Sequence, residues 1–344
     1  MKNQDLIATA TELMAGDKGL LAMDENTTSI NNRFIKIGLP PTLEYRRAYR
    51  ELIITTPGLG DHLSGAILFD ETLYQSTKAG ILFLEVLTAA GVMPGIKVDE
   101  GTVDLAGFPD ENITRGLDKL RDRLAKYRQF GLRFAKWRAV IRIGADIPSK
   151  GCIDANMLDL ARYAALCQEA GMVPVVEPEV LMDGDHSMER CFEVMEKVLQ
   201  ELFRQLMEQR VDLHGMLLKP NMILPGVASG QKVSIAAVAD ATLECLLKHV
   251  PGTVPGIAFL SGGQPPALAT AHLNAMHAIE KLPWELTFSF SRAIQQPALE
   301  YWKGREENVE IAQRLLYDRI GLNALARQGK YEPGMEKDIQ ITGH

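Results

Sequence analysis

Eight short apolar runs recur along this chain, and polar or charged residues follow each of them. They cover residues 20–25, 64–69, 95–99, 134–140, 173–179, 213–221, 257–263 and 286–292. Short apolar runs bounded by turn residues are typical of strands that are buried on both faces. The pattern therefore predicts eight buried strands.

Segments with apolar residues three and four positions apart separate these runs, as in amphipathic helices. The predicted helices cover residues 3–15, 40–54, 81–90, 117–127, 156–170, 187–209, 234–249 and 306–327, with one more opened by Pro265 and Pro266. Strand–helix alternation implies a parallel sheet, and eight such units predict closure into a (β/α)8 TIM barrel. No repeat, low-complexity tract or linker-like shift divides the chain. We therefore expect a single TIM-barrel domain over residues 1–344, with an N-terminal helix at 3–15 and a polar C-terminal tail at 328–344.

The bulk composition is that of a soluble globular protein, with 46% hydrophobic and 24% charged residues. The net charge of -7 argues against a nucleic-acid partner, and no apolar run approaches the roughly 20 residues that span a membrane. Cys152, Cys167, Cys191 and Cys245 form no CxxC pair and are predicted to be packing residues in a reducing compartment. Nothing directs export, so a cytoplasmic location is expected, with a mature organellar form that has lost its presequence as the alternative.

One predicted strand end carries a lysine that is suited to covalent chemistry. The apolar run at 213–221 reaches Lys219, and Pro220 and Asn221 then stop the strand. Desolvation and a second cation nearby would lower the pKa of this lysine and leave free amine for Schiff-base formation with a carbonyl. Taken alone, a lysine snorkelling at a strand end is the better interpretation. The residues at the other strand ends favour the catalytic one.

In a TIM barrel the carboxyl ends of all strands meet at one mouth, where active sites lie. Carboxylates and cations suited to proton transfer end the first, fourth and fifth runs: Asp24, Lys136, Arg138, Glu177 and Glu179. Candidate phosphate ligands end the seventh and eighth runs, where barrels commonly bind phosphate: Ser261, Gly262, Gly263, Ser289 and Arg292. A second anion site would draw on Lys97 and Arg138, and on Ser29 and Arg33 in the first strand–helix loop. For any one of these residues, an ion pair without catalytic function is about equally consistent with the sequence.

The sequence does not predict a metal site or another cofactor. The seven histidines show no HxxxH or HxH spacing, and residues 183–186 are better interpreted as a turn that leads into a helix. Gly262 and Gly263 are not followed by Lys-Ser or Lys-Thr, so they form no Walker loop.

Six dispersed passages together resemble class I fructose-bisphosphate aldolases. They are residues 21–25, 134–138, 176–179, 217–222, 259–264 and 287–289, and the similarity extends from about 19 to 331. The resemblance implies that Lys219 forms an iminium with the C2 carbonyl of the substrate. It further implies that Glu177 is the acid/base for carbinolamine dehydration, that Asp24 accepts the proton of the C4 hydroxyl, and that Lys136 and Glu179 tune and orient Lys219.

The resemblance also implies a substrate with two phosphates. Ser29, Arg33, Lys97 and Arg138 match positions around one phosphate, and Ser261, Gly262, Ser289 and Arg292 match positions around the other. The implied activity is that of a glycolytic and gluconeogenic lyase: reversible, metal-independent cleavage of fructose 1,6-bisphosphate to dihydroxyacetone phosphate and glyceraldehyde 3-phosphate. A homotetramer is implied in the same way. The alternatives are a Schiff-base aldolase that acts mainly on fructose 1-phosphate or sedoheptulose bisphosphate, and a non-catalytic scaffold on the same fold.

Three positions depart from the family pattern. Asn26 replaces a serine of many relatives, and the tail ends in Gly343-His344 where well-known relatives carry a tyrosine. Ser291 replaces a glycine after the eighth run, and it would be strained if the position required a positive φ.

Overall fold

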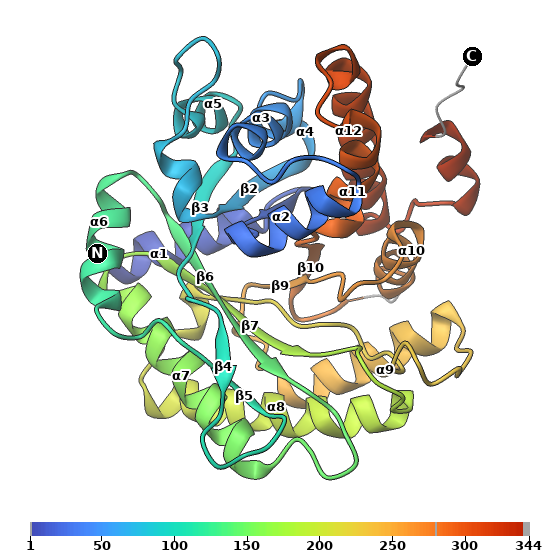
Figure 1. The fold of residues 1–344 in the computed structure, drawn as a ribbon. Helices are drawn as coiled ribbons and strands as arrows, with labels where there is room; N and C mark the ends of the chain where they lie inside the picture. Colours follow the sequence, from blue (N-terminus) through green and yellow to red (C-terminus); the bar gives the residue numbers. More distant parts are fainter. Residues whose placement is uncertain (1, 279–280, 340–344) are drawn as a thin grey trace.

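The computed structural model describes residues 2–278 and 281–339 (Figure 1). Within these ranges, eight parallel strands lie at the centre of the molecule and helices surround them. Around the barrel the strands are β1 (Gly19–Met23), β2 (Leu63–Leu68), β3 (Met93–Lys97), β6 (Phe134–Ile141), β7 (Val173–Val180), β8 (Leu217–Leu218), β9 (Gly256–Phe259) and β10 (Glu285–Phe288). The first and last strands meet where the Ala22 N–H donates to the Phe290 carbonyl at 3.1 Å. The predicted (β/α)8 barrel is confirmed.

Nine of the twelve helices in the described ranges lie close to predicted positions. The twelve are α1 (Lys2–Leu13), α2 (Thr27–Lys36), α3 (Leu43–Ile54), α4 (Leu59–His62), α5 (Phe83–Ala89), α6 (Leu120–Gln129), α7 (Lys150–Glu169), α8 (Met188–Glu208), α9 (Ile235–His249), α10 (Pro266–Met276), α11 (Arg292–Trp302) and α12 (Val309–Arg327). Helix α7 begins six residues before its predicted start, because the Ser149 hydroxyl caps it by accepting the Cys152 N–H at 3.1 Å.

Four elements were missed by the sequence pattern. Helix α2 was assigned to a loop, helices α4 and α11 were not predicted, and neither was the small antiparallel hairpin of β4 (Thr102–Asp104) and β5 (Asn112–Thr114). Ser29 and Arg33 therefore lie on a helix and not on a loop. The prediction of a strand from residue 213 was also wrong, because Leu213–Gly215 forms a 3₁₀ turn and only Leu217 and Leu218 pair with neighbouring strands.

The predicted polar tail is partly structured. The 3₁₀ segment η4 (Pro333–Ile339) lies within it. Two other short 3₁₀ segments, η1 (Asp70–Tyr74) and η3 (Glu306–Asn308), lie earlier in the chain. Glu336 of η4 accepts two hydrogen bonds from the buried Arg319 guanidinium, at 2.6 and 2.8 Å. This ion pair holds the tail against α12, a contact that its polar composition did not predict. Residues 340–344, including the terminal His344, lie outside the described residues.

The interior of the barrel is filled below the mouth. Leu6, Ala10 and Leu13 of α1 belong to the same buried cluster as inward residues of the strands, so this helix closes the lower end. Backbone and side chain approach closely there, since a Cβ on Gly256 would lie 2.2 Å from the Met14 Cε. Within the described part of the barrel, open space for a ligand is therefore left at the carboxyl ends of the strands.

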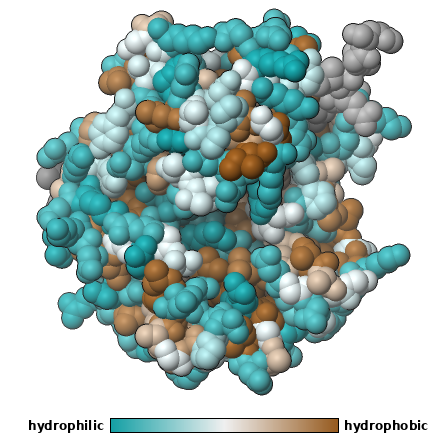
Figure 2. All heavy atoms as spheres, viewed as in Figure 1, coloured by the Kyte–Doolittle hydropathy of each residue, from teal (hydrophilic) through white to brown (hydrophobic). Residues whose placement is uncertain are grey.

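The surface matches the composition of the chain. Hydrophilic residues cover most of the face seen in Figure 2, with apolar side chains scattered among them. None of the helices in the described ranges is long and apolar enough to cross a membrane.

The burial of His272 predicts how the free energy of unfolding depends on pH. The His272 ring is only 2% exposed, and its Nδ1–H donates to the Gln264 Oε1 at 2.7 Å. Burial lowers the pKa of His272 from 6.5 to about 4, so between these values the unfolded chain binds a proton that the folded chain does not. We expect the free energy of unfolding to fall as pH drops from about 6.5 to about 4, by up to roughly 3 kcal/mol for this residue.

Urea unfolding of wild type and His272→Asn over this pH range measures the effect. The asparagine retains a donor for Gln264 but does not titrate, so its stability should depend less steeply on pH. The matched control is His214→Asn at an exposed position. Equal slopes for wild type and His272→Asn would contradict the assignment.

Candidate active site

A cavity of about 770 Å³ opens at the carboxyl ends of the strands. Thirteen of the fourteen predicted site residues line it: Asp24, Ser29, Lys97, Lys136, Arg138, Glu177, Glu179, Lys219, Ser261, Gly262, Gly263, Ser289 and Arg292. Its volume lies in the range of small-molecule sites. Residues that are up to 268 positions apart in the chain are thus brought to one place, as a barrel mouth requires.

Two lysines and two carboxylates form the buried centre of this cavity. The Lys219 N–H donates to the Val176 carbonyl at 2.8 Å, which fixes the end of β8 beside β7. Its Nζ lies 3.1 Å from Glu177 Oε1. The Nζ of Lys136 lies 2.6 Å from Asp24 Oδ2 and 3.1 Å from Glu177 Oε2. Glu177 is therefore placed between the two amines.

The opposite charges of this centre shift one another's pKa values and so determine which groups are ionised. Burial by itself lowers the pKa of Lys136, but Asp24, Glu177 and Asp99 outweigh it and hold that pKa above its usual range. Burial likewise raises the pKa of Asp24 and of Glu177, yet the cations, Lys136 first and then Lys219, hold both pKa values below their usual range. Lys136 is consequently a fixed cation, and the two carboxylates are ionised proton acceptors at neutral pH.

Strand geometry explains why these side chains face the cavity. Side chains two apart share a face of a strand, so Lys136 and Arg138 point inward while Trp137 between them is buried outward and stacks on Tyr163. Glu177 and Glu179 repeat this spacing on β7, and Glu179 accepts a hydrogen bond from Arg138 Nε.

The same spacing extends to residues that sequence analysis missed. Arg142 on the β6 side and Asp183 on the β7 side also line the cavity, farther out along each inward row. Extending the two-residue period past Arg138 and Glu179 would have found both. Thr102 and Asn112 of the hairpin line the cavity too, but no signal in the sequence placed a hairpin there.

The ends of β9 and β10 together form one group of anion-binding candidates. Gly262 and Gly263 adopt positive φ values of 60° and 88°, which glycine adopts without strain. A Cβ on Gly263 would lie 3.1 Å from Arg292 Nη2, so the guanidinium lies against this backbone. The Ser289 hydroxyl is buried and has no hydrogen-bond partner among the described residues. A buried hydroxyl without a partner in a cavity indicates a position for a ligand.

The second group of cations is engaged by carboxylates. Lys97 Nζ lies 2.5 Å from Asp99 Oδ1, and Arg138 pairs with Glu179. Arg33 is the predicted residue that does not line the cavity. Its guanidinium pairs with Glu25 and lies 3.3 Å from the Gln296 side-chain oxygen.

Ser29 does line the cavity, at the start of α2. The Asn26 side chain caps this helix by accepting the Ser29 N–H at 2.8 Å. Asn26 therefore replaces the family serine with another good helix cap.

The cysteine side chains lie in the interior of the protein. All four cysteines are free and buried, as expected of packing residues. In the part of the chain that the structure describes, no group of three or more His, Cys, Asp or Glu side chains is arranged to bind a metal ion.

The fold and the cavity define a TIM-barrel protein with a buried lysine–carboxylate centre. The family model described as fructose-bisphosphate aldolase class-I matches residues 5–342. A probable fructose-bisphosphate aldolase class 1 of Xanthomonas axonopodis pv. citri is 53% identical over 333 residues, covering 96% of this chain and 100% of the relative. Cytosolic fructose-bisphosphate aldolase 4 of Arabidopsis thaliana is 49% identical, covering 96% of this chain and 85% of its own.

A solved structure extends the comparison to three dimensions. Fructose-bisphosphate aldolase from Plasmodium falciparum, in complex with TRAP and a small-molecule inhibitor, matches with a TM-score of 0.95 and 44% identity, covering 97% of this chain and 96% of its own. The chain belongs to the class-I fructose-bisphosphate aldolase family. The family resemblance drawn from the sequence is confirmed.

Proposed function

We propose that this protein reversibly cleaves fructose 1,6-bisphosphate into dihydroxyacetone phosphate and glyceraldehyde 3-phosphate through a Schiff base on Lys219. As a class-I fructose-bisphosphate aldolase it is a carbon–carbon lyase. The observation that carries the proposal is the Lys219 amine, buried and 3.1 Å from the Glu177 carboxylate. The relatives do not favour the alternative substrates. A non-catalytic scaffold has no reason to keep Lys219, Glu177 and Asp24 in one cavity.

Glu177 is the acid/base for forming the Schiff base. Its carboxylate takes a proton from the Lys219 ammonium, and the free amine then attacks the C2 carbonyl. The resulting carbinolamine loses its hydroxyl as water when Glu177 returns the proton. The fixed charge of Lys136 holds Glu177 in the ionised state from which this sequence starts.

Asp24 is the base for cleavage of the carbon–carbon bond. Its carboxylate accepts the C4 hydroxyl proton as the C3–C4 bond breaks and glyceraldehyde 3-phosphate leaves. The bonding electron pair moves into the iminium, which becomes a neutral enamine, so no metal is needed to stabilise a carbanion. Protonation at C3 and hydrolysis then release dihydroxyacetone phosphate and restore Lys219. Lys136 and Glu179 position the groups around this lysine.

Each phosphate of the substrate is assigned to one group of residues according to its distance from the C2 carbon. Strand β9 neighbours β8, which Lys219 directly follows, so the group at β9 and β10 is suited to the C1 phosphate next to the iminium carbon. Its members are Ser261, Gly262, Gly263, Ser289 and Arg292. The C6 phosphate is assigned to Ser29, Arg33, Lys97 and Arg138, and Arg33 would have to leave Glu25 to reach it.

We further propose a cytoplasmic homotetramer. The supporting observation for location is that three Arabidopsis thaliana relatives at 49% identity are named cytosolic, although another, at 47%, is named chloroplastic. The tetramer rests on the family resemblance.

The test of function is fructose 1,6-bisphosphate cleavage in excess EDTA, where activity should persist. In this assay Arg292→Ala and Arg138→Ala should each lose roughly 1.5–3 kcal/mol in kcat/KM, about 10- to 150-fold, because a hydrogen bond to a charged group is removed. With fructose 1-phosphate, which lacks the second phosphate, only Arg292→Ala should retain its effect.

Arg162→Ala, at an exposed position paired with Asp159, is the matched control and should cleave normally. Loss of activity in EDTA that zinc restores would refute the mechanism. Equal losses of both arginine variants on both sugars would refute the two-phosphate assignment.

A further inference from the structure

The barrel is joined differently at β1 and β10 than at its other strand pairs. In the described ranges no strand ladder connects these two strands, and one backbone hydrogen bond, from Ala22 to Phe290, joins them near the mouth. Side chains supply the other connections there. The Gln295 Nε2 donates to the Ala22 carbonyl at 2.6 Å, from α11 across to β1.

We call the junction between β1 and β10 the seam. Ser291 and Glu25 form a second side-chain connection across it. The Ser291 hydroxyl donates to Glu25 Oε1 at 2.8 Å, and Arg33 pairs with the same oxygen. Gln295 also donates to the Ser291 hydroxyl, at 3.2 Å. We refer to the contact between Ser291 and Glu25 as the seam bridge. Its acceptor is a carboxylate, so it is a charge-assisted hydrogen bond and stronger than a neutral one.

The conformation of Ser291 indicates that its hydroxyl serves this bridge. Ser291 is the residue before α11, a position where serine ordinarily caps the helix by accepting a backbone N–H. No such cap bond forms here, and the hydroxyl donates to Glu25. The φ of Ser291 is -106°, so the position does not require a positive φ and the condition for that strain is not met.

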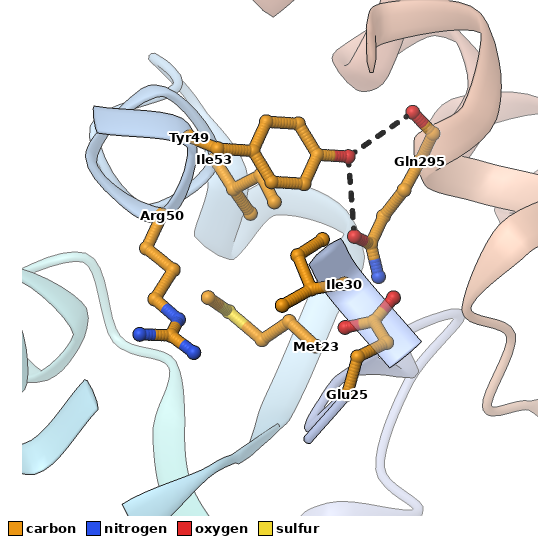
Figure 3. A pocket seen from close by; sticks show the side chains of 7 residues that line it. All are labelled: Met23, Glu25, Ile30, Tyr49, Arg50, Ile53 and Gln295. Atoms are coloured by element: carbon orange, nitrogen blue, oxygen red, sulfur yellow. Dashed lines mark hydrogen bonds between the residues drawn. The ribbon is translucent and has the colours of Figure 1, made fainter. Parts of the chain in front are cut away.

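The side chains next to the seam bridge are closely packed. Figure 3 shows Glu25, Gln295 and Tyr49 around a buried cavity of only about 10 Å³, room for at most about one water. Gln295 is fully buried, and the Tyr49 hydroxyl lies 3.2 Å from its side-chain oxygen. Gln295 therefore has little space to move, and its hydrogen bond holds the Ser291 hydroxyl in place.

The bridge joins the sequence neighbours of two proposed active-site residues. Glu25 follows Asp24, the cleavage base, and Ser291 precedes Arg292, the C1-phosphate ligand. Glu25 and Ser291 both line the cavity, so the bridge forms part of its wall.

We propose that Ser291 is a positioning residue that, through Glu25, fixes Asp24 relative to Arg292. A substrate whose C1 phosphate is bound at Arg292 then presents its C4 hydroxyl to Asp24. This inference rests on the roles proposed above for those two residues. Loss of the bridge should impair the step that uses both of them more than the step that uses Arg292 alone.

Two reactions separate these steps. Cleavage of fructose 1,6-bisphosphate needs Asp24 and the phosphate site, whereas borohydride trapping of dihydroxyacetone phosphate needs Lys219 and the phosphate site only. We expect Ser291→Ala and Ser291→Gly to lower kcat for cleavage about tenfold, the lower end of the effect of a charged hydrogen bond. The trapping rate should change less than about twofold, and Ser291→Thr, which retains the hydroxyl, should restore cleavage.

Ser234→Ala is the matched control, because it removes a serine hydroxyl that caps α9 by accepting the Ala237 N–H at 3.1 Å. It should lower thermal stability without changing the ratio of cleavage to trapping. Cleavage by Ser291→Ala at the wild-type rate, or equal losses of cleavage and trapping, would overturn the inference. Absence of cleavage and trapping in the wild-type protein would instead overturn the proposed function.

Discussion

Sodium borohydride added with dihydroxyacetone phosphate should attach the three-carbon unit covalently to Lys219. Hydride adds to the iminium carbon and converts the hydrolysable C=N bond into a stable secondary amine, so activity is lost irreversibly. Lys219 is only 3% exposed and lies at the Glu177 carboxylate, which makes it the amine best placed to form the iminium. Peptide mapping by mass spectrometry identifies the labelled lysine.

Lys219→Met should abolish both trapping and cleavage, lowering kcat at least about 10⁴-fold, or roughly 5.5 kcal/mol of barrier, because methionine retains the buried stem but cannot form an iminium. Lys248→Met, at a half-exposed position on α9, is the matched control and should be labelled and active like wild type. A label on Lys136 or Lys97 would show that the nucleophile has been misassigned.

Asp24→Asn should separate Schiff-base formation from bond cleavage. The amide is nearly isosteric with the carboxylate but cannot accept the C4 hydroxyl proton. Cleavage should therefore fall by about 10²- to 10⁴-fold, the usual contribution of a general base. Trapping with dihydroxyacetone phosphate does not use this proton and should proceed at close to the wild-type rate. Stopped assays of both reactions on one preparation give the comparison.

The exposed Asp146→Asn is the control for this substitution and should leave both reactions unchanged. If Asp24→Asn lost trapping and cleavage to the same extent, the carboxylate would be serving only to hold the Lys136 ammonium 2.6 Å away, and another base would be needed.

The sequence predicted the parts of this protein that depend on local periodicity. The buried strands at 134–140 and 173–179 were predicted clearly, because most of their residues are apolar and the charged residues lie two apart on one face. The two-residue spacing of Lys136 with Arg138, and of Glu177 with Glu179, also assigned these side chains to one face. Closure of the barrel then brought Lys219 to the same mouth. Thirteen of the fourteen predicted site residues line the cavity.

Only the tertiary structure determined which side chains and strands pair with one another. Arg33 has the charge and the position of a phosphate ligand, but Glu25 lies beside it and engages its guanidinium. The strand before Lys219 is only two residues long, because Leu217 and Leu218 alone pair with β7 and β9, whereas the apolar run that predicted it is longer. Periodicity specifies the face of an element, whereas a hydrogen bond such as that from Ser291 to Glu25 joins residues 266 positions apart and exists only once the barrel has closed.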